Sequence, residues 1–181
     1  MRQKNFFIRF IISLSTIGLL NLFCSDQSKA QEVDYKAYSI YVYNFIKYIE
    51  WPEASKKGDF VIGIVGDSPV INELKKLAAS KKANGQTIAI KKFSSIAEVD
   101  QCQILYISSS KSNTLKEALE KIKNMPTLLI AEREGLARKG AGINFVTLED
   151  DTLKFELNKK AIESHNLRIA LALISLGLLI K

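Results

Sequence analysis

The sequence predicts a single α/β domain built on a mostly parallel sheet, and three observations indicate it. Short, nearly continuous apolar runs alternate with helical stretches of about ten to fifteen residues, which is the pattern of βαβ units. An aromatic amphipathic stretch precedes the first apolar run, and two segments of alternating polar and apolar residues follow the last one. No internal repeat or low-complexity linker divides the chain, so one domain, residues 31–181, is expected after a signal peptide, residues 1–30.

The first 30 residues have the features of an export signal. Basic residues open the chain, the run from Phe10 to Phe23 carries no charge, and Ser28-Lys-Ala30 places small residues where a signal peptidase cleaves. The run is shorter than the about 20 residues that span a bilayer. We therefore expect cleavage after Ala30, with an uncleaved membrane anchor as the alternative. Lipidation at Cys24 is disfavoured because the bulky Phe23 precedes it.

Charge and cysteine content exclude some classes of protein. Residues 1–30 carry four basic residues and one acidic residue, so cleavage lowers the formal net charge from +7 to +4. The remaining lysines are scattered rather than clustered with aromatic residues, and a nucleic-acid partner is not required. Only Cys102 is left, so the mature chain forms no internal disulfide. A buried structural thiol is favoured over an intermolecular bridge or a redox sensor.

The aromatic stretch, residues 35–52, contains five of the six tyrosines and the only tryptophan. With about 100° between successive residues, Tyr38, Val42, Phe45 and Ile49 fall on one face of a helix. We expect this face to pack against the sheet or against the final helix. Pro52 ends the helix, because the residue before a proline is disfavoured in the α region.

The opposite face of this helix is mostly charged but also contains two apolar residues. Ile40 and Tyr43 share it with Lys36, Lys47 and Glu50. Exposed aromatic and aliphatic side chains are the usual anchors of protein interfaces. Ile40, Tyr43 and Lys47 are therefore the predicted partner-binding residues.

Four apolar runs after the aromatic stretch predict buried parallel strands. A proline at position 69 begins the helix after the first strand, and Ser112 or Asn113 caps the helix after the third. Asn84-Gly85 predicts a turn before the second strand. The predicted strands are residues 60–65, 87–90, 104–107 and 127–130.

The pattern changes toward the C-terminus. Residues 143–146 and 153–157 alternate apolar and polar side chains, which predicts an antiparallel hairpin with one wet face. Asn158 is the predicted N-cap of a final helix over residues 159–180. Residues 169–180 carry no charge but are too few to cross a membrane, so we expect this apolar helix to be buried.

The first strand ends in a turn of the kind that binds anions in open α/β sheets. Gly66, Asp67 and Ser68 close the strand and open the next helix, whose backbone N–H groups point outward. Ser108 lies at the equivalent end of the third strand and can line the same crevice. These four residues are the predicted ligand-binding residues, although such a turn mostly serves close packing.

The sequence offers no constellation for catalysis or for a metal ion. His165 is the only histidine, no cysteine pair accompanies it, and no Gly-x-Ser-x-Gly motif is present. The acidic run Glu149-Asp-Asp151 is typical of a solvated turn. We therefore predict no catalytic residue, no metal site and no cofactor.

The order of these segments resembles the YfiR-like family of periplasmic regulators. A helix that ends in Trp-Pro, followed by a strand with Gly-x-x-Gly, is the most specific part of the resemblance. The matching segments are Lys36-Ala37, residues 43–52, residues 60–66, Gly85, residues 102–106, residues 128–130, residues 142–145 and residues 154–158 before a leucine-rich end.

The resemblance implies a non-catalytic α/β domain, similar to a small Rossmann-like sheet, in the periplasm of a Gram-negative bacterium. It also implies a possible homodimer that binds the periplasmic part of an inner-membrane diguanylate cyclase, restrains it, and thereby lowers cyclic di-GMP and biofilm formation. Because the family is wide, a sensor kinase is the other partner that it implies. Members of this type carry paired cysteines thought to respond to redox state, whereas the mature chain keeps only Cys102.

Two functions from different classes therefore remain after the sequence analysis. The first is a regulatory protein that docks on a membrane sensor through apolar surface. The second is a periplasmic sensor of a small ligand, a nucleotide or an amino acid, at Gly66 to Ser68 and Ser108. An enzyme has no positive indication beyond the crevice.

Overall fold

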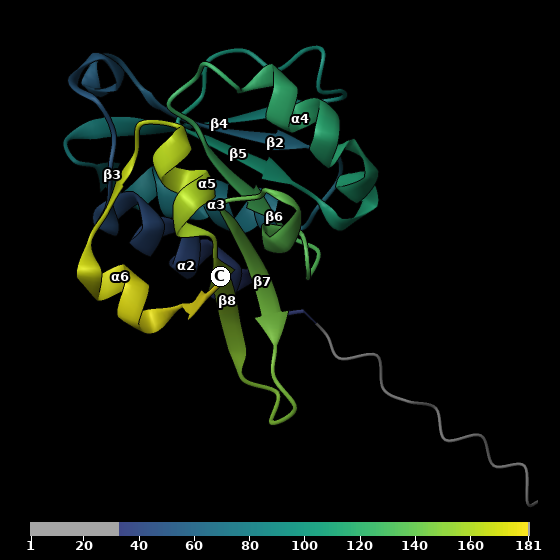
Figure 1. Ribbon diagram of the computed structural model, residues 1–181. Helices are drawn as coiled ribbons and strands as arrows, with labels where there is room; N and C mark the ends of the chain where they lie inside the picture. Colours follow the sequence, from purple (N-terminus) through teal and green to yellow (C-terminus); the bar gives the residue numbers. More distant parts are fainter. Residues whose placement is uncertain (1–32, 181) are drawn as a thin grey trace, which may run out of the picture. The chain divides into compact units, whose positions relative to one another are not determined.

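The computed structural model describes residues 33–180, and the predicted signal peptide and its cleavage site lie outside this range. The chain from Asp34 onward forms one compact unit (Figure 1). Between residues 33 and 180, no helix is long and apolar enough to span a bilayer.

An eight-stranded, mostly parallel sheet forms the centre of this unit, which confirms the predicted mixed α/β class. The strand order is β10-β8-β7-β6-β5-β2-β4-β3. The pairs β4–β2, β2–β5, β5–β6 and β6–β7 are parallel, while β7–β8 is the predicted antiparallel hairpin. The predicted wet face is wrong for β7, because residues 143–146 are all buried. The strands are β2 (Phe60–Val65), β3 (Lys82–Ala83), β4 (Gln86–Phe93), β5 (Ile104–Ile107), β6 (Leu128–Ala131), β7 (Ile143–Thr147), β8 (Leu153–Leu157) and β10 (Leu178–Leu179).

Both faces of the central strands are buried, as their continuous apolar sequences predict. Successive side chains of a strand point to opposite faces. On β5, Ile104 and Tyr106 therefore join one core, together with residues of the helices α2 (Tyr35–Tyr48) and α3 (Val70–Ser80). Leu105 and Ile107 join the other core, which helix α4 (Leu115–Lys121) covers.

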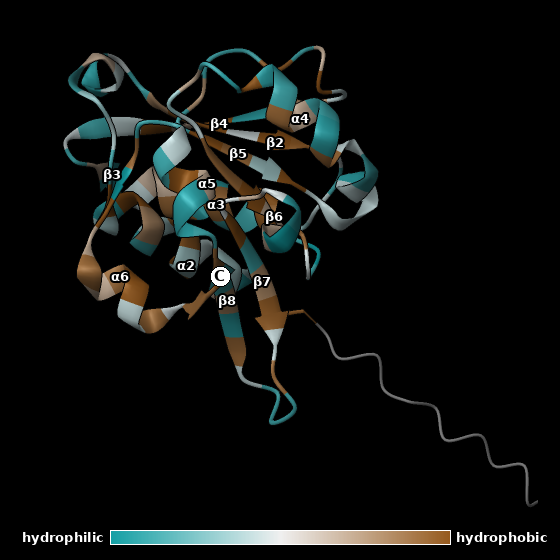
Figure 2. Ribbon diagram, viewed as in Figure 1, coloured by the Kyte–Doolittle hydropathy of each residue, from teal (hydrophilic) through white to brown (hydrophobic). Residues whose placement is uncertain are grey.

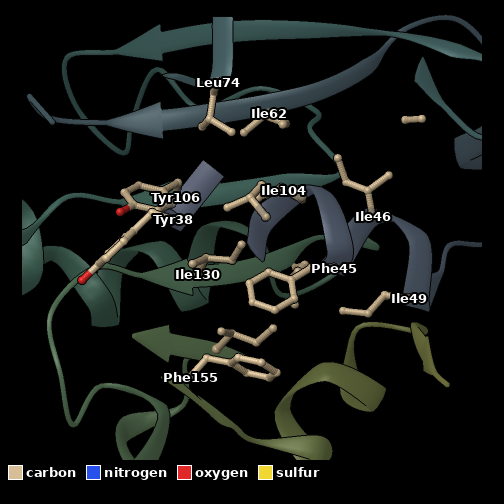
Figure 3. Close-up of a cluster of buried hydrophobic side chains, with 14 of the residues drawn as sticks. Tyr38, Phe45, Ile46, Ile49, Ile62, Leu74, Ile104, Tyr106, Ile130 and Phe155 are labelled. Atoms are coloured by element: carbon tan, nitrogen blue, oxygen red, sulfur yellow. The ribbon is translucent and has the colours of Figure 1, made fainter. Parts of the chain in front are cut away.

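The aromatic helix α2 packs its predicted inner face on the β7–β8 hairpin and the neighbouring strands (Figure 3). The Asp34 side chain caps its N-terminus by accepting a hydrogen bond from the Ala37 amide at 3.0 Å. Tyr38 lies 4.0 Å from Phe145, and Phe45 lies 5.0 Å from Phe155, between ring centroids. These contacts place Tyr38 and Phe45 of the predicted stripe against the sheet, one of the two packing partners that the sequence left open.

Helix α2 ends earlier than the proline predicts. Its last helical residue is Tyr48, and Ile49 is extended, with φ of −111° and ψ of 133°. Ile49 is buried, as expected, but on the two-residue strand β1 (Ile49–Glu50), which pairs antiparallel with β9 (Arg168–Ile169). Trp51 then packs edge-to-face on Phe60 and donates its indole N–H to the Gln103 carbonyl at 3.1 Å. The pairing of β1 with β9 therefore replaces the helical turn that the sequence predicts just before Pro52.

The prediction of a single final helix over residues 159–180 is wrong. Asn158 caps a helix as predicted, accepting a hydrogen bond from the Ala161 amide at 2.9 Å, but this helix, α5 (Lys159–Ser164), is short. Asn166 follows with a left-handed backbone, φ +58°, a conformation that ends helices and that asparagine tolerates. The chain then forms β9, helix α6 (Leu171–Leu176) and β10. The expected burial is also wrong, because the Leu171 side chain is 83% exposed.

Short 3₁₀ helices complete the connections: η1 (Glu53–Lys56), η2 (Ser109–Thr114) and η3 (Ala137–Lys139).

Candidate functional site

The predicted partner-binding residues of α2 lie in different surroundings. Ile40 is 51% exposed, and Lys47 is exposed as well. Tyr43 is half-buried: its ring packs against the core and its hydroxyl donates to the Lys82 carbonyl at 3.5 Å. The Lys47 ammonium lies over the Tyr43 ring, 4.8 Å from the centroid. Ile40 is therefore the one apolar side chain of the three that faces water.

A larger set of exposed apolar side chains lies at the end of the chain, where the sequence predicted a buried helix. Half of the large hydrophobic side chains that are exposed between residues 33 and 180 belong to α6 and β10. We call these four residues, Leu171, Leu176, Leu178 and Leu179, the C-terminal leucines. Figure 2 shows α6 as a largely apolar helix at the periphery of the unit, and α6 contacts α2. Sequence periodicity could not find this surface, because it depends on the break at Asn166.

The predicted ligand-binding turn lies where the strand order reverses. The chain passes from β2 to β4 on one side and then to β5 on the other, so the carboxyl ends of β2 and β5 form the switch point of the sheet. The fold brings Gly66 and Ser108 together there. A Cβ atom added at Gly66 would lie 2.3 Å from the Ser108 hydroxyl oxygen and 2.6 Å from Cγ of Lys111. The space above Gly66 is therefore filled by side chains of this chain.

The other two residues of the turn have partners within the protein. Ser68 is buried, and its hydroxyl accepts a hydrogen bond from the Val70 amide at 3.3 Å, at the start of α3. Asp67 is exposed and forms an ion pair with Lys92, which lowers the pKa of the Asp67 carboxyl through a hydrogen bond. Asp67 and Ser68 thus stabilise the turn and the first turn of α3.

A buried carboxylate near the switch point was missed by the sequence analysis. Glu132, directly after β6, is only 8% exposed, and its carboxylate accepts hydrogen bonds from two groups. The Tyr35 hydroxyl donates to one of its carboxylate oxygens at 2.8 Å, and the Ser109 amide donates to the other at 3.0 Å. These bonds attach the first turn of α2 to the carboxyl ends of β5 and β6. Residues 97 positions apart form the first bond, so no local pattern could reveal it.

Three tyrosines surround this carboxylate. Burial is the main cause that raises the pKa of both Tyr35 and Tyr38 to about 12. The hydrogen bond to Glu132 adds to it at Tyr35, and the Glu132 charge adds to it at both tyrosines. The Tyr106 hydroxyl is completely buried, has no hydrogen-bond partner among residues 33–180, and has a pKa raised well above its ordinary value by burial. Figure 3 shows the Tyr38 and Tyr106 rings pointing their hydroxyls toward the same end of the sheet.

Alkaline titration should separate these tyrosines from exposed ones. We expect Tyr35 and Tyr38 to ionise near pH 12 in the folded protein, against about 10 in the unfolded chain. Since the folded state holds the neutral phenol, its contribution to stability is complete below pH 10 and is lost as the pH rises through 12. Ultraviolet absorbance of phenolate, recorded in buffer and in denaturant, measures both states. A native titration completed near pH 10 would contradict the buried arrangement.

Neither a metal site nor a reactive thiol is indicated in the described residues. Residues 33–180 contain no group of three or more histidine, cysteine, aspartate or glutamate side chains able to hold a metal ion. The Cys102 thiol is buried against Gly63, and burial raises its pKa to about 12. A thiol with this pKa is almost entirely protonated at neutral pH and is a poor nucleophile.

A family model described as YfiR/HmsC-like matches residues 35–177 of the chain. The match runs from the first residue of α2 to the residue before β10, and so covers nearly all of the described unit. Among curated proteins, no relative matches the chain.

Proposed function

We propose a function from the premise that this chain belongs to the YfiR/HmsC-like family. It is a periplasmic, non-catalytic regulatory protein that binds the periplasmic part of an inner-membrane signalling protein and restrains it. The signalling protein is of the diguanylate cyclase type, so release raises cyclic di-GMP and promotes biofilm formation. A sensor kinase is the alternative partner. The proposal includes export by cleavage after Ala30, and the description of the sheet as Rossmann-like, which the strand order at the switch point supports.

The exposed apolar surface on α2 and α6 is the observation that supports this function. Monomeric soluble proteins expose single apolar residues commonly but grouped ones rarely, and grouped ones mark interaction surfaces. The C-terminal leucines are grouped in this way, since they lie on the adjoining elements α6 and β10, and Ile40 is a further exposed apolar residue on α2, which contacts α6. We assign docking to Ile40 and the C-terminal leucines, with Lys47 at the margin, and give Tyr43 a smaller part because it is half-buried.

A double substitution tests the docking surface without disturbing the core. Ile40→Asp with Leu171→Asp replaces two exposed side chains, and substitutions at such positions usually change stability by less than about 0.5 kcal/mol each. In cells that lack the protein, we expect cyclic di-GMP and biofilm to rise. The wild-type chain should restore the low level, whereas the double variant, although folded and exported, should not.

Leu148→Asp is the matched control. Leu148 is 38% exposed and lies after β7, in the loop of the β7–β8 hairpin, so this variant should restrain cyclic di-GMP like the wild type. Equal melting temperatures of all three proteins are required for the comparison. Full restraint by the folded double variant would contradict the docking surface. Unchanged cyclic di-GMP on removal of the protein would contradict the proposed output.

Small-ligand sensing at Gly66, Asp67, Ser68 and Ser108 is the second proposal and has less support. The Tyr106 hydroxyl, which has no hydrogen-bond partner within the described residues, favours a polar group near the switch point. The filled space above Gly66 argues against ligand binding at this turn, because a ligand there must first displace the side chains of Ser108 and Lys111.

A further inference from the structure

Two grooves meet at the small β1–β9 strand pair, away from the switch point. The first adjoins the margin of the docking surface, since Lys47 lines it. One has a volume of about 500 Å³ and the other of about 610 Å³. Both are lined by Glu50, Trp51 and Arg168, so they adjoin along this strand pair. Each volume falls within the range of about 300–1,000 Å³ that is usual for small-molecule sites.

The two grooves carry opposite charge. Three cationic side chains, Lys47, Lys56 and Arg168, line the first groove against a single carboxylate, that of Glu50. In the second groove the order is reversed, because Glu50, Glu53 and Glu163 outnumber Arg168. We call them the cationic groove and the acidic groove.

Two charged side chains, Glu50 and Arg168, line both grooves. Glu50 and Arg168 stand directly opposite each other in the register of β1 and β9. Both are exposed, and neither takes part in an ion pair within residues 33–180. The other charges are partly engaged: Lys56 pairs with Glu53, and Glu163 lies 3.6 Å from Lys159. Glu50 and Arg168 are therefore the groups best able to bind an external charge.

The cationic groove also has an apolar wall. Tyr48 and Ile169 supply its exposed apolar surface beside the lysines, whereas Ile49 and Phe60 also line it but are each only 2% exposed. An anion that carries an apolar side chain therefore finds complementary surface there, whereas the acidic groove offers chiefly charge for a cation.

We propose that the two grooves together bind a short peptide with free termini. The terminal carboxylate and an apolar C-terminal side chain occupy the cationic groove, with Arg168 and Lys47 as partners of the carboxylate. The terminal ammonium occupies the acidic groove next to Glu50. A peptide fits better than a single amino acid, because its two charges are separated along the chain and reach both grooves, whereas one amino acid carries both charges on one carbon.

Calorimetric titration of the purified mature protein with the tripeptide Ala-Ala-Leu tests this site. We expect binding by the unblocked tripeptide and none by its N-acetylated, C-amidated form, which lacks both charges. Free leucine should bind at least about tenfold more weakly, since it engages one groove. Arg168→Gln and Glu50→Gln should each weaken tripeptide binding by about tenfold or more, because each removes a hydrogen bond to a charged group. Added salt should weaken binding too, since the charges are exposed.

The controls separate this site from general charge effects and from the docking surface. Arg133→Gln and Glu134→Gln change exposed charges outside both grooves and should leave the affinity unchanged. Ile40→Asp with Leu171→Asp should also bind the tripeptide normally. No binding at millimolar Ala-Ala-Leu, equal binding of the blocked form, or equal binding of free leucine would each overturn the proposal. Loss of cyclic di-GMP restraint in Arg168→Gln and Glu50→Gln, without tripeptide binding by the wild type, would assign the grooves to a partner segment instead.

Discussion

Phe45→Ala should lower the free energy of unfolding by about 3–5 kcal/mol, the usual cost of removing a buried phenylalanine ring. Phe45 is completely buried on α2, where its ring meets Phe155 edge-to-face at 5.0 Å and Phe145 at 6.2 Å. The loss combines the transfer energy of the ring, its aromatic contacts and the cavity that remains. At roughly 2–4 °C per kcal/mol for a chain of this size, the melting temperature should fall by about 6–20 °C.

Denaturant unfolding monitored by circular dichroism measures this loss directly. Tyr48→Ala is the matched control, because Tyr48 belongs to the same helix but is 37% exposed, and it should cost far less. Phe45→Leu, which keeps most of the volume, should fall between the two. If Phe45→Ala and Tyr48→Ala were equally stable, α2 would not be packed on the hairpin as described.

Gly66→Ala should lower the free energy of unfolding by about 2–5 kcal/mol, and two effects contribute to this loss. Gly66 has a φ of +89°, a left-handed conformation that costs a residue with a side chain about 1–2 kcal/mol. The new methyl group would also lie 2.3 Å from the buried Ser108 hydroxyl, and overpacking of this kind costs about 1–3 kcal/mol. Chemical unfolding of the variant measures the sum.

A second substitution separates the two sources. Ser108→Ala removes the nearest atom, so the double variant Gly66→Ala with Ser108→Ala should regain part of the overpacking cost but keep the backbone cost. Gly85→Ala is the control for the backbone alone, since Gly85 has a φ of +94° and no atom within 4 Å of an added Cβ. If Gly66→Ala and Gly85→Ala were equally stable, the claim that side chains fill the space above Gly66 would be wrong.

The parallel strands could be predicted from sequence, because a strand that is buried on both faces is apolar at nearly every position. Residues 104–107 are all apolar and residues 60–65 are apolar except for Gly63, and these ranges are the observed limits of β5 and β2. The inner stripe of α2 was found for the same reason, since its period follows from helix geometry alone. In each case the local sequence and the tertiary environment agree.

The features that sequence could not predict all depend on contacts between distant segments. Ile49 leaves the helix to pair with Ile169, and Glu132 accepts its hydrogen bond from Tyr35. The grooves combine residues of α2, β1, η1 and the segment after α5. The uncharged run 169–180 suggested a buried helix, but the helix ends before the left-handed Asn166 and the run then forms β9, α6 and β10. The C-terminal leucines are exposed there, while Leu173 is buried. Of the predicted ligand-binding residues, the fold brings Gly66 and Ser108 together, but the Ser108 side chain fills the space above Gly66 instead of leaving room for a ligand.

The two outermost strands of the sheet, β3 and β10, are only two residues long. Long unpaired strand edges act as templates on which further chains add by backbone hydrogen bonding, and very short edge strands are a common protection against it. Strand β10 therefore covers Glu156 and Leu157 at the end of β8, part of an edge that would otherwise be open along its five residues. By this pairing β10 limits strand addition at this edge of the sheet, although its own Leu178 and Leu179 are exposed.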